Sequence, residues 1–96
     1  MNDQRIAVEP SPIPRGAKVR ISYRGLLPQS GAESCWLHYG FDGWQTPATI
    51  PMTREPDNSF HASVTATGSR ELNFCFKDSA ANWDNNNGWD WSCPIY

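Results

Sequence analysis

The sequence predicts a single small domain built as an antiparallel β-sandwich, and three observations support this fold class. The chain has 96 residues, enough for one thin core that buries about two-thirds of the surface of the unfolded chain. Several segments alternate apolar and polar residues with the period of two that is typical of half-buried strands, and turn-forming residues separate them. No window shows sustained helical periodicity.

We place the sandwich itself at residues 16–96 and treat residues 1–15 as a separate segment. Ile6 and Val8 alternate with polar neighbours, so a short edge strand fits there. Three prolines follow within residues 10–14, and each fixes φ and removes a backbone donor. This proline-rich part indicates a stiff leader or linker.

The first half of the sandwich contains two predicted strands. The stretch Lys18–Tyr23 alternates cleanly, and the Gly, Pro and Ser residues of Gly25–Gly31 predict a turn region after it. In the next strand, Ser34–Gly40, we expect Trp36 and His38 to face outward. The residues that alternate with them are expected to face the core, and these are Cys35, Leu37 and Tyr39.

A loop that carries a tryptophan follows this strand. Asp42 and Gly43 form a turn pair that would project Trp44 out of the strand, close to His38. The short stretch Ala48–Met52 is bracketed by prolines, which predicts a strand at a sheet edge. A histidine beside a loop tryptophan suits a sugar ligand, although a satisfied surface histidine is the alternative explanation.

Two further strands are predicted at residues 60–67 and 71–77, and the connection between them is informative. A tight hairpin at the Gly-Ser pair that follows the first strand would place Val64 opposite Asn73 and would mix apolar with polar faces. A longer loop would restore Val64 against Phe74, and a crossing from one sheet to another would also remove the conflict. In both cases Phe74 belongs to the core and Asn73 does not.

The stretch Asn82–Trp91, NWDNNNGWDW, is the most unusual part of the chain. Asn, Asp and Gly are turn formers, so it is a loop or a tight strand connection. An indole can cover the C–H face of a sugar, and asparagine can both donate to and accept from its hydroxyls. We favour a ligand contact for Trp83, whereas Trp89 and Trp91 are expected to plug the open end of the core. Pro94 marks the final segment as an edge strand or an unpaired end.

Composition and charge argue against several classes of partner. The formal net charge is −2, so no electrostatic case exists for nucleic acid or a membrane surface. No apolar run approaches the roughly 18 residues of a membrane span, and the amino-terminal MNDQRIAVEP lacks the core of a signal peptide. We expect a cytoplasmic protein as given, or an extracellular one if the chain is a module excised from a secreted enzyme.

Neither a metal site nor a redox site is indicated. Asp84, Asn86 and Asp90 could supply oxygen ligands for calcium, but the EF-hand pattern is not met, so we favour turn stabilisation and expect no metal and no cofactor. The cysteines lack CxxC spacing, so buried reduced thiols are expected, with one disulfide as the alternative in an exported protein. They are Cys35, Cys75 and Cys93.

Enzyme chemistry finds little support in the sequence. There is no GxSxG elbow and no HExxH motif. Asp42, Asp84 and Asp90 could pair as glycosidase acids, yet each lies in a Gly/Asn turn, where carboxylates usually bond backbone N–H groups. Cys75 with either histidine could form a thiol pair, but no spacing singles it out.

Two motifs together resemble a known family. LHYGFDGW at Leu37–Trp44 and FKDSAANWDNNNG at Phe76–Gly88 resemble starch-binding modules of carbohydrate-binding module family 25, and the family 53 modules are similar in outline. The resemblance implies an immunoglobulin-like β-sandwich that binds α-1,4-glucans without catalysis. It also implies a contact surface formed by one histidine and two tryptophans, with polar loop residues that reach hydroxyls. By motif position these residues are His38, Trp44, Trp83, Asn85 and Asn86.

The expected function is therefore non-catalytic binding of starch, glycogen or maltooligosaccharides by an aromatic platform. Trp44 and Trp83 would be set at an angle that suits a curved glucan, and His38 would bond a hydroxyl between them. The chain is expected to be a monomer, and a module of, or partner to, an amylolytic or glucan-synthesising enzyme. The alternatives are a small glycoside hydrolase that uses Asp84 and Asp90, or a protein-interaction sandwich with an aromatic hot spot.

Overall fold

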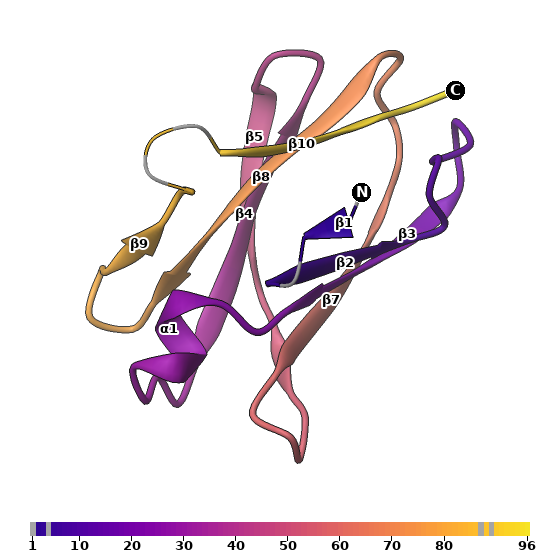
Figure 1. Ribbon diagram of the computed structural model, residues 1–96. Coiled ribbons are helices and arrows are strands. Elements are labelled where there is room, and N and C mark those ends of the chain that lie inside the picture. Colours follow the sequence, from indigo (N-terminus) through magenta and orange to yellow (C-terminus); the bar gives the residue numbers. More distant parts are fainter. Residues whose placement is uncertain (1, 4, 87, 89) are drawn as a thin grey trace.

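Two antiparallel β-sheets form a sandwich in the computed structural model, which describes residues 2, 3, 5–86, 88 and 90–96 (Figure 1). This confirms the predicted all-β sandwich. In chain order the elements are β1 (Asn2–Asp3), β2 (Ile6–Glu9), β3 (Lys18–Tyr23), α1 (Leu26–Gln29), β4 (Cys35–Phe41), β5 (Gln45–Pro51), β6 (Thr53–Arg54), β7 (Phe60–Thr65), β8 (Glu71–Asp78), β9 (Trp83–Asp84) and β10 (Trp91–Pro94).

The first sheet has the strand order β1-β2-β3-β7-β6. The strands β2, β3 and β7 keep the alternation that predicted them, and Val19 lies opposite Val64 in the register of β3 with β7. The segment before residue 16 is part of this architecture, because β2 pairs with β3 and places Ile6 in the core. The proline-rich part packs on the sandwich as well, since Ile13 is fully buried and bridges Ile95.

The second sheet has the order β10-β8-β4-β5, and β9 pairs with β8 (Figure 1). The strand β5 lies at the sheet edge, as its prolines predict, but it begins at Gln45, before the expected position 48. Because β7 belongs to the first sheet and β8 to the second, the chain crosses between the sheets at residues 66–70. The crossing predicted as one of two options is thus confirmed, and no tight hairpin forms there.

The core lies between the two sheets and includes Trp91 of the edge strand β10. This indole is 2% exposed and stacks on Phe74, with 6.2 Å between ring centroids and 15° between planes. The prediction that Trp91 plugs the core is therefore confirmed. The same prediction for Trp89 falls outside the described residues. Phe74 is fully buried, as predicted.

All three cysteines are buried and free of disulfide bonds in the described chain, in agreement with the expected reduced thiols. Burial raises the pKa of Cys35 to about 11 and that of Cys75 to about 12. The predicted turn region after β3 contains one unexpected turn of helix, α1, which lies beside β9 (Figure 1). Among the described residues, no helix has the length and apolar character that crossing a membrane would require.

Candidate functional site

The outer face of the second sheet carries a group of aromatic side chains. His38 lies near the middle of β4, between Thr49 of β5 and Cys75 of β8 in the sheet register. The ring centroids of His38 and Trp44 are 5.4 Å apart with 23° between the planes. Those of His38 and Trp83 are 5.5 Å apart with 83° between the planes. The structure thus brings together the three aromatic residues that the sequence singled out.

The two indoles around His38 differ in orientation. Because Trp44 is nearly parallel to the imidazole and Trp83 is nearly perpendicular to it, the two indole planes are steeply inclined to each other. Trp83 is 47% exposed, whereas Trp44 and His38 are partly buried. A large exposed indole is unusual on a small domain whose other apolar side chains are mostly buried. The arrangement is an aromatic corner in which Trp83 is the most exposed ring.

Trp44 is positioned by the three-residue loop that joins β4 to β5. Phe41 pairs with Gln45 across this loop, and Trp44 adopts the left-handed conformation with φ of +67°. The Oδ1 atom of Asn73 accepts hydrogen bonds from the backbone N–H groups of Gly43 at 3.0 Å and Trp44 at 3.1 Å. Asn73 is 6% exposed and is itself in the middle of the sheet, so the loop is attached to a rigid strand.

Gly40 allows the same loop to fold back on β4. A Cβ atom at position 40 would lie 3.0 Å from the Cα atom of Trp44, so a larger residue would push the loop outward. The glycine of the HYG motif is therefore explained by close backbone approach. The close approach at Gly40 places the indole of Trp44 over the ring of His38, which lies two residues before Gly40 in β4.

Trp83 is positioned by the short strand β9 and by its neighbour Asp84. The register places Trp83 opposite Lys77 of β8. Asp84 points inward, is 6% exposed, and accepts hydrogen bonds from the Tyr23 hydroxyl at 2.5 Å and from the backbone N–H of Leu26 at 3.3 Å. The alternation of a two-residue strand thus sends Asp84 into the protein and leaves Trp83 on the surface.

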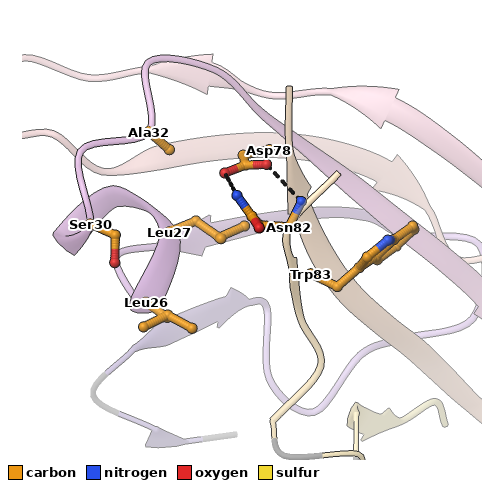
Figure 2. Close-up of a pocket in the computed structure, with 7 residues that line it drawn as sticks. All are labelled: Leu26, Leu27, Ser30, Ala32, Asp78, Asn82 and Trp83. Carbon is orange, nitrogen blue, oxygen red and sulfur yellow. Dashed lines mark hydrogen bonds between the residues drawn. The ribbon is translucent and has the colours of Figure 1, made fainter. Parts of the chain in front are cut away.

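A pocket of about 420 Å³ lies beside Trp83, between α1 and the connection from β8 to β9 (Figure 2). Its polar wall is occupied by an internal interaction, because Asp78 accepts hydrogen bonds from the backbone N–H of Asn82 at 2.9 Å and from its side-chain N–H at 3.0 Å. These bonds hold the pKa of Asp78 below its usual range. Figure 2 shows the indole of Trp83, which lines the pocket, directed away from Leu26.

His38 has one ring nitrogen engaged within the protein. Its Nδ1 atom lies 2.8 Å from the hydroxyl oxygen of Thr49. This contact fixes the ring orientation and leaves Nε2 as the nitrogen that a ligand hydroxyl can meet. Since a neutral imidazole carries one N–H, the direction of the Thr49 bond decides whether Nε2 donates or accepts.

The two loop asparagines predicted to reach hydroxyls both take part in the fold of their own loop. Asn86 accepts a hydrogen bond from Arg5 at 2.9 Å through Oδ1 and donates one through Nδ2 to the Asp90 carbonyl at 3.2 Å. Asn85 is exposed, and its Oδ1 accepts from the backbone N–H of Gly88 at 3.0 Å. Both polar ends of the Asn86 side chain are therefore used internally, which leaves Asn85 as the more available of the two.

Two of the three carboxylates considered as glycosidase acids, Asp42 and Asp84, make structural hydrogen bonds. Asp84 is bonded as described above, and Asp42 accepts from the backbone N–H groups of Ser69 at 2.9 Å and Arg70 at 2.6 Å. The bonds from Ser69 and Arg70 hold the pKa of Asp42 below its usual range. Within the described residues, no group of three or more His, Cys, Asp or Glu side chains is arranged to hold a metal ion. Asp42 binds backbone donors, as expected in a turn, whereas Asp84 binds the Tyr23 hydroxyl as well as a backbone N–H.

Sequence reasoning missed two residues that position the site. Asn73 was expected on the solvent side of β8 and lies there, but the loop at residues 42–44 covers it. Tyr23 was identified only as part of an alternating strand, and its hydroxyl donates a hydrogen bond to Asp84, the residue after Trp83. A single asparagine between apolar residues of a central strand is the signal that could have identified Asn73 as a buried, bonded amide.

A small β-sandwich that presents an inclined pair of indoles around a histidine has the form of a non-catalytic sugar-binding module. The sequence profile of the family described as "Starch/carbohydrate-binding module (family 53)" matches residues 19–74, more than half of the chain. The chain therefore belongs to carbohydrate-binding module family 53, the second of the two similar families named from its motifs. The matched part includes His38 and Trp44, whereas Trp83 lies beyond it.

One relative is an alpha-amylase of Clostridium acetobutylicum. It is 35% identical over 82 residues, which cover 83% of this chain and 11% of the amylase. The chain thus spans about a tenth of that protein's length, a proportion that fits a module and leaves most of the amylase unmatched. No solved structure matches the chain.

Proposed function

We propose that the chain binds α-1,4-glucans, including starch, glycogen and maltooligosaccharides, on the corner formed by His38, Trp44 and Trp83. The observation that carries this proposal is the position of His38 between two inclined indoles, at 5.4 and 5.5 Å from their centroids. Two inclined platforms suit a ligand whose successive rings turn, as they do in an α-1,4 chain. A flat β-1,4 chain would contact one platform and miss the other.

Each part of the corner has a distinct role in this proposal. The indoles cover the C–H faces of neighbouring sugar rings and remove apolar surface from water. Nε2 of His38 forms a hydrogen bond with a hydroxyl between the two stacked rings, and Asn85 lies in the loop that follows Trp83. A preformed, open surface of this size should bind with a dissociation constant of about 10 μM to 1 mM.

The proposal is tested by comparing two glucans that differ in linkage geometry. Isothermal titration with maltoheptaose should give a measurable heat, and titration with cellohexaose should give little or none. Retardation of the protein in gels that contain amylopectin provides an independent measurement. Equal heats from the two oligosaccharides would contradict the preference for α-glucans, and release of reducing sugar would point to catalysis instead.

We also infer that the chain acts as a module of an amylolytic enzyme, or as its partner. The match to a tenth of an alpha-amylase supports this context. A fusion of the chain to an alpha-amylase that lacks its own binding module should digest granular starch faster than the free amylase. Digestion of soluble maltoheptaose should be unchanged, because the module supplies attachment only. Unchanged digestion of granules would contradict the inference.

A further inference from the structure

The aromatic corner continues into a longer row of side chains on the same sheet face. His38 lies between Trp44 and Trp83, and the Nζ atom of Lys77 lies 5.8 Å from the ring centroid of Trp83. The same Nζ atom lies 5.7 Å from the ring centroid of Trp36. Five side chains thus follow one another at nearly constant spacing, in the order Trp44, His38, Trp83, Lys77 and Trp36.

The register of the second sheet explains this row. Trp36 and His38 are two residues apart in β4 and therefore point to the same face. Lys77 of β8 lies opposite Trp36 on one side and opposite Trp83 of β9 on the other. Neighbouring strands are about 4.8 Å apart, so Lys77 fits between two indoles that are two strands apart. The part of the row formed by His38, Trp36, Lys77 and Trp83 is fixed by strand pairing, and only Trp44 lies in a loop.

Lys77 has the chemistry of a sugar contact rather than that of a surface ion pair. No carboxylate among the described residues lies within ion-pair distance of its ammonium group. The ammonium carries three N–H donors and is attracted by the faces of both indoles. Trp36 is only partly buried, so apolar ring surface and unneutralised donors meet on one open face. That combination is the one already present at His38, Trp44 and Trp83.

We propose that Trp36 and Lys77 form a further subsite for the same α-glucan chain, so that the ligand-binding surface extends beyond Trp83. The occupant is the next glucose unit or units of the bound chain, because the new subsite shares Trp83 with the aromatic corner. This inference rests on the proposed function. Trp36 supplies a third platform, and Lys77 donates to a hydroxyl at the rim of the added sugar ring.

The test compares a short and a long ligand by isothermal titration. In Trp36→Ala, the dissociation constant for maltoheptaose should rise about fivefold or more, as expected for loss of one stacking platform, while that for maltotriose should change less than about twofold. Lys77→Met keeps the apolar stem between the indoles and removes the N–H donors, so it should show the same selective effect in weaker form. Tyr96→Ala removes another exposed aromatic, outside the row, and should change neither constant.

The outcomes separate this inference from the proposed function. Wild-type protein that binds neither oligosaccharide would contradict the proposed function itself. Wild-type protein that binds both, with Trp36→Ala changing neither constant or both by the same factor, would overturn the further subsite alone. If Lys77→Met weakens the binding of both oligosaccharides by the same factor, the lysine only supports Trp83. This result would also overturn the further subsite. If Trp36→Ala does not fold, the dissociation constants of Lys77→Met for the two oligosaccharides decide whether the further subsite exists.

Discussion

The side chain of Asn73 holds the backbone of Trp44, because its Oδ1 atom accepts a hydrogen bond from the Trp44 N–H at 3.1 Å. The same atom accepts from Gly43, and the amide nitrogen of Asn73 donates to the carboxylate of Glu71. A buried amide of the second sheet thus fixes a loop residue of the binding corner in a left-handed conformation. The position of Trp44 thus depends on a buried residue of the neighbouring strand β8.

We predict that Asn73→Ala weakens both the fold and glucan binding. Two backbone N–H groups would lose their acceptor, which should lower the free energy of unfolding by about 1–3 kcal/mol. The Trp44 loop would loosen, so maltoheptaose affinity should fall at a temperature where the variant is still folded. Asn73→Asp keeps an acceptor oxygen and should retain more affinity than Asn73→Ala, although its charge faces Glu71. Urea titration and calorimetry measure the two effects, and equal affinity of Asn73→Ala and wild type would contradict the prediction.

The tryptophans should separate into ligand contacts and a core residue. Trp83→Ala and Trp44→Ala should lose most retardation by amylopectin, with melting temperatures within a few degrees of wild type, since a stacking contact is worth about 1–3 kcal/mol of binding. Trp91→Ala should instead lose about 3–5 kcal/mol of stability through the cavity it creates, and should still bind when cold. His38→Ala should weaken binding less than either contact variant, because its hydroxyl partner can turn to water. If Trp83→Ala binds amylopectin normally while a well-folded Trp91→Ala does not bind it, the assignment of Trp83 as the contact and Trp91 as the core residue is wrong.

The strands β2, β3 and β7 could be predicted because each keeps a period-two pattern with one face buried. Val19 and Val64 illustrate this, since both are apolar positions of alternating segments and both lie in the core, opposite each other. The burial of Asn73 could not be predicted from alternation. Alternation assigns a side chain to a face, but it does not reveal that a loop 30 residues away covers that face.

The candidate site was only partly predictable for the same reason. Motif spacing pointed to His38, Trp44 and Trp83, and the structure brings these rings together. The hydrogen bond from Tyr23 to Asp84 joins residues 61 positions apart, and no local pattern reports such a contact. Turn composition identified the loop around Asn86 but could not show that its amide bonds Arg5. Long-range polar contacts of this kind are not specified by any local pattern in the sequence.

Tyr23 and Asp84 form a buried pair whose loss should disturb the support of Trp83. Tyr23→Phe removes the hydroxyl that donates to Asp84 and that also accepts from the backbone N–H of Leu27 at 3.1 Å. The ring would still stack on Phe76, so the change isolates the polar contact. We expect a loss of about 1–3 kcal/mol in the free energy of unfolding, the usual cost of leaving buried polar groups unsatisfied.

The same pair gives an expectation at alkaline pH. Burial and the bond to Asp84 raise the pKa of Tyr23 above its ordinary value. Above about pH 10 the unfolded chain releases this phenolic proton while the folded chain keeps it, so stability from this group is complete below that pH and declines as the pH rises. Urea midpoints between pH 9 and 11 should therefore fall more steeply for wild type than for Tyr23→Phe. Parallel slopes would show that the phenol is not protected.

Asp42 should contribute stability that is lost in acid, and with it the geometry of the Trp44 loop. Its carboxylate accepts hydrogen bonds from Ser69, Arg70 and Glu71, at the crossing into β8, while Asn73 of that strand holds Trp44 in return. Because the pKa of Asp42 is lowered in the folded protein, its contribution is complete above the ordinary aspartate pKa of about 4 and disappears as the pH falls through the lowered folded value.

The comparison that isolates this residue is wild type against Asp42→Asn, followed by urea unfolding at several pH values from neutral to acid. Asn keeps the shape of the side chain but has one acceptor oxygen and no charge, so the variant should be less stable than wild type at pH 7. The difference should shrink as the pH falls below 4, because wild type then loses what the variant already lacks. Asp57 and Asp78 also have lowered pKa values, and they titrate alike in both proteins, so they cancel in the difference. A stability difference that stays constant across this range would mean that the hydrogen bonds at Asp42 do not depend on its charge.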